Sequence, residues 1–215
     1  MPDRLRPLWD FDDLDASERR FRQQLEREET DPGRAEVLTQ LARVHSLRED
    51  FDGCAELLAE AEPLASTAAA QVRVELERGR MLRSSGDGAS ALPVFESAYE
   101  RAVEARELWL AGDAAHMCAI SVPEAMEEWT QRGLDLAARE PDAAYWAGPL
   151  LNNLGWHQYE AGDYAQALET FERALEVRRR DPDNPQAITW AEEAVEEARK
   201  ALERVLERLG IIGPC

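Results

Sequence analysis

Apolar residues recur along this chain at the three- and four-residue spacing of amphipathic helices. One clear example is a run that lies on a single side of a helix and contains Ala167, Leu168, Phe171, Ala174 and Leu175. The two-residue alternation of half-buried strands is rare, and β-branched residues are scattered rather than grouped. The pattern therefore predicts an all-α chain.

Helix-breaking residues divide the chain into segments of about 10–20 residues, which is the ordinary length of helices in globular proteins. Glycine, proline and aspartate dominate these breaks because they favour turns over continued helix. The breaks fall at Asp31-Pro32-Gly33, Asp52-Gly53, Gly86-Asp87-Gly88, Ser121-Val122-Pro123, Pro141-Asp142, Gly162-Asp163 and Asp181-Pro182. Such short connections predict that consecutive helices run antiparallel.

One internal unit between Leu151 and Pro182 carries a recognisable pattern. Its landmarks, in order, are Leu154, Gly155, Tyr159, Gly162, Asp163, Ala167, Phe171 and Ala174. This unit resembles the tetratricopeptide repeat (TPR) family, whose pattern is W-x2-L-G-x2-Y, then A-x3-F, then P. Leu151 stands in the place of the tryptophan, and Gln158 stands in the place of the first tyrosine.

Degenerate copies of the same unit precede it along the chain. The small-residue position of the first helix falls at Ala42, Gly79, Met117 and Gly155, with steps of 37, 38 and 38 residues. The matching positions of the second helix are Leu58, Phe95, Thr130 and Phe171, which follow after 16, 16, 13 and 16 residues. The shorter third interval predicts a tight corner at residues 121–123.

The resemblance implies a right-handed superhelical solenoid of antiparallel helical hairpins that forms one continuous domain. Its predicted parts are an N-terminal arm and leading helix (1–34), four repeats (35–71, 72–109, 110–147 and 148–184), a C-terminal capping helix (185–209) and a tail (210–215). The capping helix has two alternative interpretations, the first helix of a fifth repeat or a dimerisation surface.

The charge of the chain narrows the choice of partners. Its 215 residues carry 25 lysines and arginines against 44 aspartates and glutamates, which gives a formal net charge of −19. So acidic a surface argues against binding nucleic acid or an anionic membrane. No apolar run has the length of a membrane helix, and no apolar segment follows the charged N-terminus. We expect a cytoplasmic protein, and the excess of arginine and alanine suggests a bacterial source.

The residues that usually carry catalysis or hold cofactors are sparse. The three histidines and three cysteines form no zinc-binding spacing, and no phosphate loop or nucleophile motif is present. We therefore expect no enzyme activity, no catalytic residues, no cofactor and no metal. Cys54 and Cys118 are interpreted as core residues, and Cys215 as a terminal thiol.

Two acid–base pairs occupy equivalent positions in neighbouring repeats. Glu75 and Arg78 lie three residues apart in the second repeat, and Asp113 and His116 do so in the third. Buried charges must be compensated, so we expect the four side chains to form one connected polar seam. The seam is either structural or a recognition site, and as a site it suits a small molecule or a metal.

In the TPR family the first helices line a concave groove, where partners usually bind. The N-terminal half of this groove is expected to carry Arg43, Arg80 and Arg83, with Arg73 as a further candidate. The C-terminal half is expected to carry Asn152, Asn153, Trp156 and Tyr159. Two alternatives remain open, because the arginines can pair with neighbouring carboxylates and Trp156 can pack in the core.

These residues predict a non-enzymatic scaffold that binds a protein or peptide with acidic and hydrophobic parts. The alternative from another class is a self-associating structural element, and the expected state is a monomer or a weak dimer. The stretch from Trp9 to Asp15 mixes aromatic and acidic residues. We expect it to fold back over the first helices or to dock as an arm in a groove.

Overall fold

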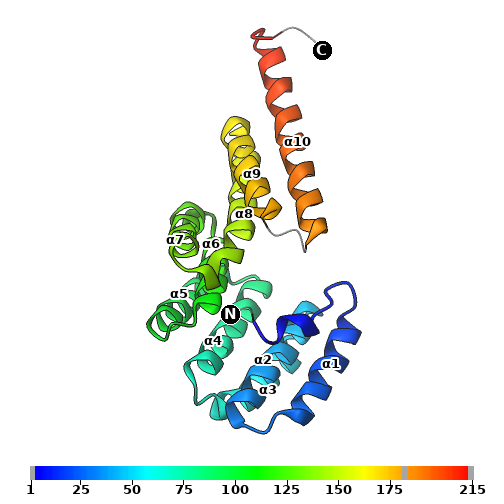
Figure 1. Ribbon diagram of the computed structural model, residues 1–215, viewed down its shortest axis with the longest axis vertical. Helices are drawn as coiled ribbons and strands as arrows, with labels where there is room; N and C mark the ends of the chain where they lie inside the picture. Colours follow the sequence, from blue (N-terminus) through cyan, green and yellow to red (C-terminus); the bar gives the residue numbers. More distant parts are fainter. Residues whose placement is uncertain (1–2, 181–183, 213–215) are drawn as a thin grey trace.

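The computed structural model describes residues 3–180 and 184–212, and every regular element in these ranges is helical (Figure 1). The α-helices are α1 (Leu14–Arg27), α2 (Asp31–Leu47), α3 (Phe51–Ala61), α4 (Ala68–Ser84), α5 (Gly88–Glu104), α6 (Leu108–Ala119), α7 (Met126–Arg139), α8 (Ala147–Glu160), α9 (Tyr164–Arg179) and α10 (Pro185–Arg208). Four short 3-10 helices join them, η1 (Arg6–Leu8), η2 (Glu62–Leu64), η3 (Pro123–Ala125) and η4 (Pro141–Trp146). The predicted all-α repeat architecture is confirmed.

Turn residues fix where the helices begin. Asp50, Asp87 and Asn184 each accept a hydrogen bond from the backbone N–H three residues further on, at 3.0, 3.0 and 3.1 Å. Such caps satisfy backbone donors that a helix end leaves free. Gly86 and Gly162 have φ values of 95° and 86°, so the tight turns before α5 and α9 need residues without a side chain.

Glycine sets the separation of the two helices in two of the hairpins. A Cβ atom added to Gly155 would lie 2.5 Å from Cε1 of Phe171, and one added to Gly79 would overlap Phe95. Both phenylalanines are fully buried. The predicted pairing of a small first-helix residue with a large second-helix residue is therefore confirmed in the second and fourth repeats.

The third repeat departs from the predicted register. Met117 and Thr130 are both buried, but the close contacts of this repeat lie elsewhere, at Gly112 against Trp146 and at Gly133 against Leu150. The reason is the shape of the repeat, because α6 ends at the η3 corner and has 12 residues where α4 has 17. The predicted corner at residues 121–123 lies directly before η3 or at its first residue.

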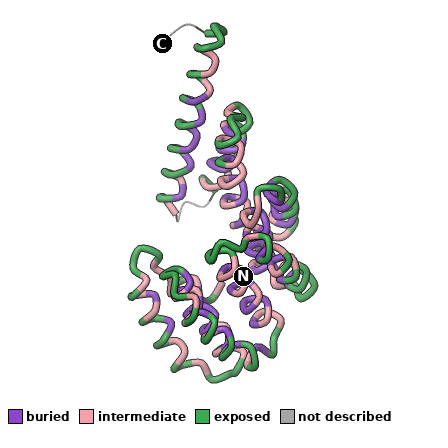
Figure 2. Tube along the Cα trace, turned by 180° about the vertical axis from the view of Figure 1, so that it is seen from behind, coloured by how far each residue is buried: buried purple, intermediate pink, exposed green. Residues whose placement is uncertain are grey.

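The last helix, α10, packs on α9 and extends along it (Figure 1). Ala191, Val195 and Ala198 are buried against Phe171 and neighbouring residues of α9, while the opposite side of α10 is exposed (Figure 2). The helix lies close to its predicted bounds of 185–209. The repeat boundaries themselves stay a prediction, and Pro182 and Cys215 lie outside the described residues.

The glycine contact makes a direct prediction about stability. We expect Gly155→Leu to lower the free energy of unfolding by about 1–3 kcal/mol or more, because the new side chain must displace Phe171. Glu192→Ala on exposed α10 should change it by less than about 0.5 kcal/mol. Urea unfolding followed by circular dichroism measures both, and an unchanged midpoint for Gly155→Leu would contradict the assigned register.

Candidate functional site

The main candidate site is a hollow of about 720 Å³ between α8 and α10. Its lining includes all four residues predicted for the C-terminal half of the groove, Asn152, Asn153, Trp156 and Tyr159. His116 of α6 also lines it. The structure therefore brings together on one side of α8 the amide and aromatic side chains that the helical spacing placed on one face.

Packing against α9 fixes the aromatic side chains of α8. The ring of Trp156 meets Phe171 edge-on at 5.1 Å and Tyr159 at 5.4 Å, yet 37% of Trp156 remains exposed. Both interpretations of Trp156 hold, because it packs on the core and also faces solvent. The Tyr159 hydroxyl donates to Glu197 at 2.8 Å, and this hydrogen bond raises the pKa of Tyr159.

The opposite wall of the hollow comes from α10 and was not predicted from the sequence. Trp190, Glu193 and Glu197 line it, and Trp190 is 61% exposed. Residue 190 lies off the apolar stripe through which α10 packs on α9. One feature of the sequence could have indicated Trp190, namely that it is a large aromatic residue outside the apolar stripe of α10.

Asn153 connects the hollow to the interior of the protein. Its amide Nδ2 donates to Nε2 of His116 at 2.8 Å, and the His116 ring packs at 5.4 Å from Trp146. Burial lowers the pKa of His116 to about 4. The imidazole is therefore neutral at pH 7 and acts as a hydrogen-bonding group rather than as a charge.

The arginine half of the predicted groove contains a buried network instead of a free binding surface. Arg80 of α4 pairs with Glu77 on its own helix and with Asp113 of α6, both at 2.5 Å. Glu77, Arg80 and Asp113 are 2%, 7% and 6% exposed. The alternative that predicted groove arginines pair with carboxylates is therefore correct for Arg80.

The charges in this network shift one another's pKa values. Burial acts to raise the pKa of Asp113, but Arg80 and Arg43 outweigh burial and hold it below its ordinary value. Burial raises the pKa of Glu77 despite the nearby arginines. Of the two carboxylates that pair with Arg80, Asp113 therefore favours the ionised form more strongly than Glu77.

The other two predicted arginines are also engaged. The guanidinium of Arg43 lies 5.5 Å from the ring centre of Trp9 and 5.7 Å from that of Phe11. Arg83 is exposed, and its Nε donates to the backbone oxygen of Ile120 at 2.9 Å. The predicted groove arginines therefore serve contacts within the chain.

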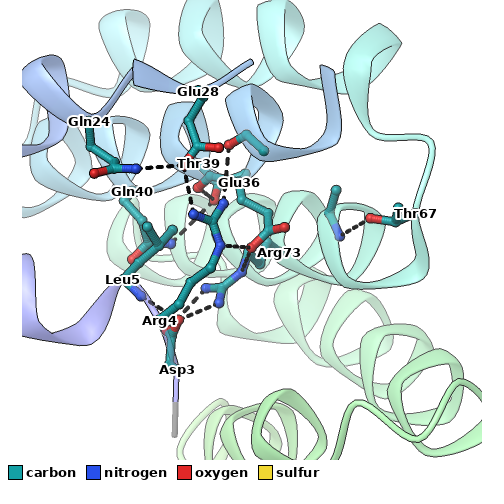
Figure 3. Close-up of polar contacts among 12 residues, drawn as sticks. Asp3, Arg4, Leu5, Gln24, Glu28, Glu36, Thr39, Gln40, Thr67 and Arg73 are labelled. Atoms are coloured by element: carbon teal, nitrogen blue, oxygen red, sulfur yellow. Dashed lines mark hydrogen bonds and ion pairs between the residues drawn. The ribbon is translucent and has the colours of Figure 1, made fainter. Parts of the chain in front are cut away.

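The N-terminal arm, residues 3–11, lies against the helices of this half of the molecule, and Figure 3 shows the polar contacts of its first residues, Asp3 and Arg4. Arg73 of α4 donates to both carboxylate oxygens of Asp3, at 2.6 and 3.2 Å, in a partly buried pair. Arg4 reaches Glu28 at 2.6 Å and Glu36 at 3.3 Å. Leu5, the next residue, is 1% exposed, so the arm joins α1, α2 and α4 through both charge and packing.

The arm continues across the helices beyond Leu5. Arg6 donates to the hydroxyl of Tyr145 in η4 at 2.9 Å, and Nε1 of Trp9 donates to Gln40 at 2.9 Å. The Trp9 ring also packs edge-on against Phe21 of α1. The stretch from Trp9 folds back over the first helices as expected, because it packs on α1 and bonds to α2. Docking of this stretch in a groove stays a prediction.

The family comparison agrees with this geometry. A family model described as Tetratricopeptide repeat matches residues 148–181, which span α8 and α9. The chain is a TPR-like helical repeat protein. A search of curated proteins gave no match. Among the described residues of this TPR-like protein, none of the helices combines the length and apolarity needed to cross a membrane.

The polar seam predicted between the second and third repeats is wrong as a connected unit. Glu75 pairs with Arg101 at 3.1 Å and Arg78 with Glu62 at 2.5 Å, while Asp113 pairs with Arg80. The reason is helical geometry, because Glu75 and Arg78 lie two residues before Glu77 and Arg80 in α4. Two residues turn about 200° around a helix, so the two pairs point to different sides.

The TPR-like protein carries a second hollow of about 660 Å³ between α7, η4 and α9. Leu134, Ala138 and Val177 supply apolar lining, and Arg173 lies at its edge. Elsewhere, residues 3–180 and 184–212 bring no three histidine, cysteine, aspartate or glutamate side chains into a possible metal site.

The low pKa of His116 predicts that stability depends on pH. The unfolded chain binds a proton near pH 6.5 and the folded protein only near pH 4, so stability is lost as pH falls through this window. Between pH 7 and pH 5 this residue should remove about 2 kcal/mol of unfolding free energy. His116→Gln should abolish that part of the slope, whereas His157→Gln should keep it. Urea unfolding at the two pH values measures the difference, and equal slopes in all three proteins would contradict a buried neutral His116.

The arm makes a separate prediction. Asp3→Asn should destabilise the protein by about 1.5–3 kcal/mol, because Arg73 loses a charged, partly buried partner. Asp12→Asn is the matched control, since Asp12 is exposed. Thermal unfolding compares them, and similar midpoints for the two variants would contradict a firmly docked arm.

Proposed function

We propose that this protein is a non-enzymatic scaffold that binds a protein or peptide segment in the hollow between α8 and α10. The observation that carries the proposal is the contrast between the two halves of the molecule. Residues of its own arm cover α2 and α4, whereas the hollow of about 720 Å³ keeps Trp156 and Trp190 exposed. Exposed aromatic residues beside a hollow are typical of an interaction site.

The lining of the hollow suits a polypeptide. Trp156 and Trp190 offer apolar surface for a side chain, and Asn152 and Asn153 offer amide donors and acceptors for a peptide backbone. The volume lies in the usual range of ligand sites, roughly 300–1,000 Å³. TPR proteins commonly mediate protein interactions, which supports the same function.

The arrangement of charges changes the partner predicted from sequence. The acidic part of that partner depended on Arg43, Arg80 and Arg83, and all three serve contacts within the chain. The hydrophobic part depended on Trp156 and Tyr159, which do line the hollow. We therefore retain the hydrophobic part and withdraw the acidic one. The cytoplasmic location, the bacterial source and the monomeric or weakly dimeric state stay predictions.

The proposal is tested with peptides selected from a randomised display library on the immobilised full-length protein. Trp156→Ala and Trp190→Ala should each weaken binding of the selected peptides at least about tenfold, because exposed tryptophans often carry much of an interface's binding energy. Isothermal titration calorimetry measures the affinities.

Arg173→Ala, at the edge of the second hollow, is the control and should change affinity less than about twofold. The proposal fails when the selected peptides bind both tryptophan variants as tightly as the original protein. It also fails when Arg173→Ala removes binding instead, which would move the site to α7 and α9.

A further inference from the structure

The hollow between α8 and α10 also indicates what kind of segment enters it, an inference that rests on the proposed function. We propose that the segment anchors itself with a lysine or arginine side chain flanked by apolar residues. The cation lies between the indoles of Trp156 and Trp190 and pairs with the carboxylate of Glu193. Four observations carry this assignment.

The first observation is an uncompensated carboxylate. Glu193 is exposed on α10 at the hollow, and within residues 3–180 and 184–212 it has neither a hydrogen bond nor an ion pair from its side chain. Its neighbour Glu197 already accepts from Tyr159 and lies 4.0 Å from Arg204. A cation entering the hollow therefore gains a partner at Glu193 without breaking an existing pair.

The second observation is that arginines lie over aromatic rings elsewhere in the protein. Arg43 lies over Trp9 and Phe11, Arg132 lies 4.5 Å from the ring centre of Trp129, and Arg6 lies 5.0 Å from that of Tyr145. Tryptophan is the strongest aromatic partner for a cation. In the described part of the chain, however, no cation lies over either Trp156 or Trp190.

The third observation is the difference in how packing holds the two indoles. Trp156 is held by Phe171 and Tyr159, so its ring is fixed before a ligand arrives. Trp190 is 61% exposed and, among the described residues, meets no other aromatic ring. A packed Trp156 gives the hollow one preorganised wall, which lowers the entropic cost of binding an inserted side chain beside the exposed Trp190.

The fourth observation is the sign of the surrounding charge. Glu193 and Glu197 line the hollow, Arg178 is its single lining arginine, and the neutral His116 adds no charge at pH 7. Arg178 is turned toward Tyr145, with its guanidinium 5.7 Å from that ring centre. The chain as a whole carries −19 charges, so the long-range field attracts a basic segment and repels an acidic one.

The display library is selected on the full-length protein and, in parallel, on its Trp190→Ala variant. Sequencing the two selected pools identifies the peptides that need Trp190. Peptides that depend on Trp190 should be enriched in lysine or arginine next to apolar residues. Replacing that cation by glutamine in a synthetic copy should weaken binding at least about tenfold, and raising the salt concentration should weaken the original peptide.

Two matched variants of α10 complete the experiment. Glu193→Gln should weaken the selected peptides about three- to fivefold, whereas Glu203→Gln, the same change further along the exposed side, should not. Trp190-dependent peptides that lack a cation, or that bind Glu193→Gln unchanged, overturn the cation anchor but leave the proposed function standing. Peptides that depend on Trp156 but not on Trp190 likewise overturn only the cation anchor. Peptides that bind both Trp156→Ala and Trp190→Ala as tightly as the original protein overturn both proposals.

Discussion

The contact between a first-helix glycine and a second-helix phenylalanine is the constraint on which the rest of this structure depends. Gly155 on Phe171 brings α8 and α9 close together, and Trp156 packs edge-on against the same phenylalanine while 37% of it stays exposed at the hollow. The same contact between Gly79 and Phe95 leaves Arg80 on the side of α4 that meets α6. Close approach therefore decides which side chains face the groove and which face the core.

Charge then divides the predicted groove into two unlike halves. In the N-terminal half, arginines meet carboxylates of the same chain, with Arg73 holding Asp3 and Arg80 holding Asp113. Removing one partner from such buried pairs is costly, which makes this half a fixed part of the fold. In the C-terminal half, α10 brings Trp190 and Glu193 to the hollow, where Trp190 is 61% exposed and Glu193 has no ion pair among the described residues. The helix α10 thus forms one wall of the hollow.

Much of this architecture was readable from local spacing. The repeat pattern predicted the helices, the close contact of Gly155 and the side of α8 that carries Trp156, because a helix repeats its geometry at every turn. The same spacing did not predict the pairing of Glu75 and Arg78 correctly. They lie two residues before Glu77 and Arg80, and two residues along a helix lead to nearly the opposite side of α4. The contacts of Asp3 with Arg73 and of Arg6 with Tyr145 join residues 70 and 139 positions apart. No local pattern contains such pairings, which arise only when the stack is complete.

The central claim is that the C-terminal half of the groove is open while the chain's own arm closes the other half. Fluorine NMR of the full-length protein with all six tryptophans replaced by 5-fluorotryptophan tests it most directly. Single tryptophan-to-phenylalanine variants assign the resonances, and a selected basic peptide is then titrated in. The account predicts shifts at Trp156 and Trp190 with Trp9 unmoved, because the peptide enters beside α10 and leaves the arm docked. A shift at Trp9 with Trp156 and Trp190 unchanged would contradict it.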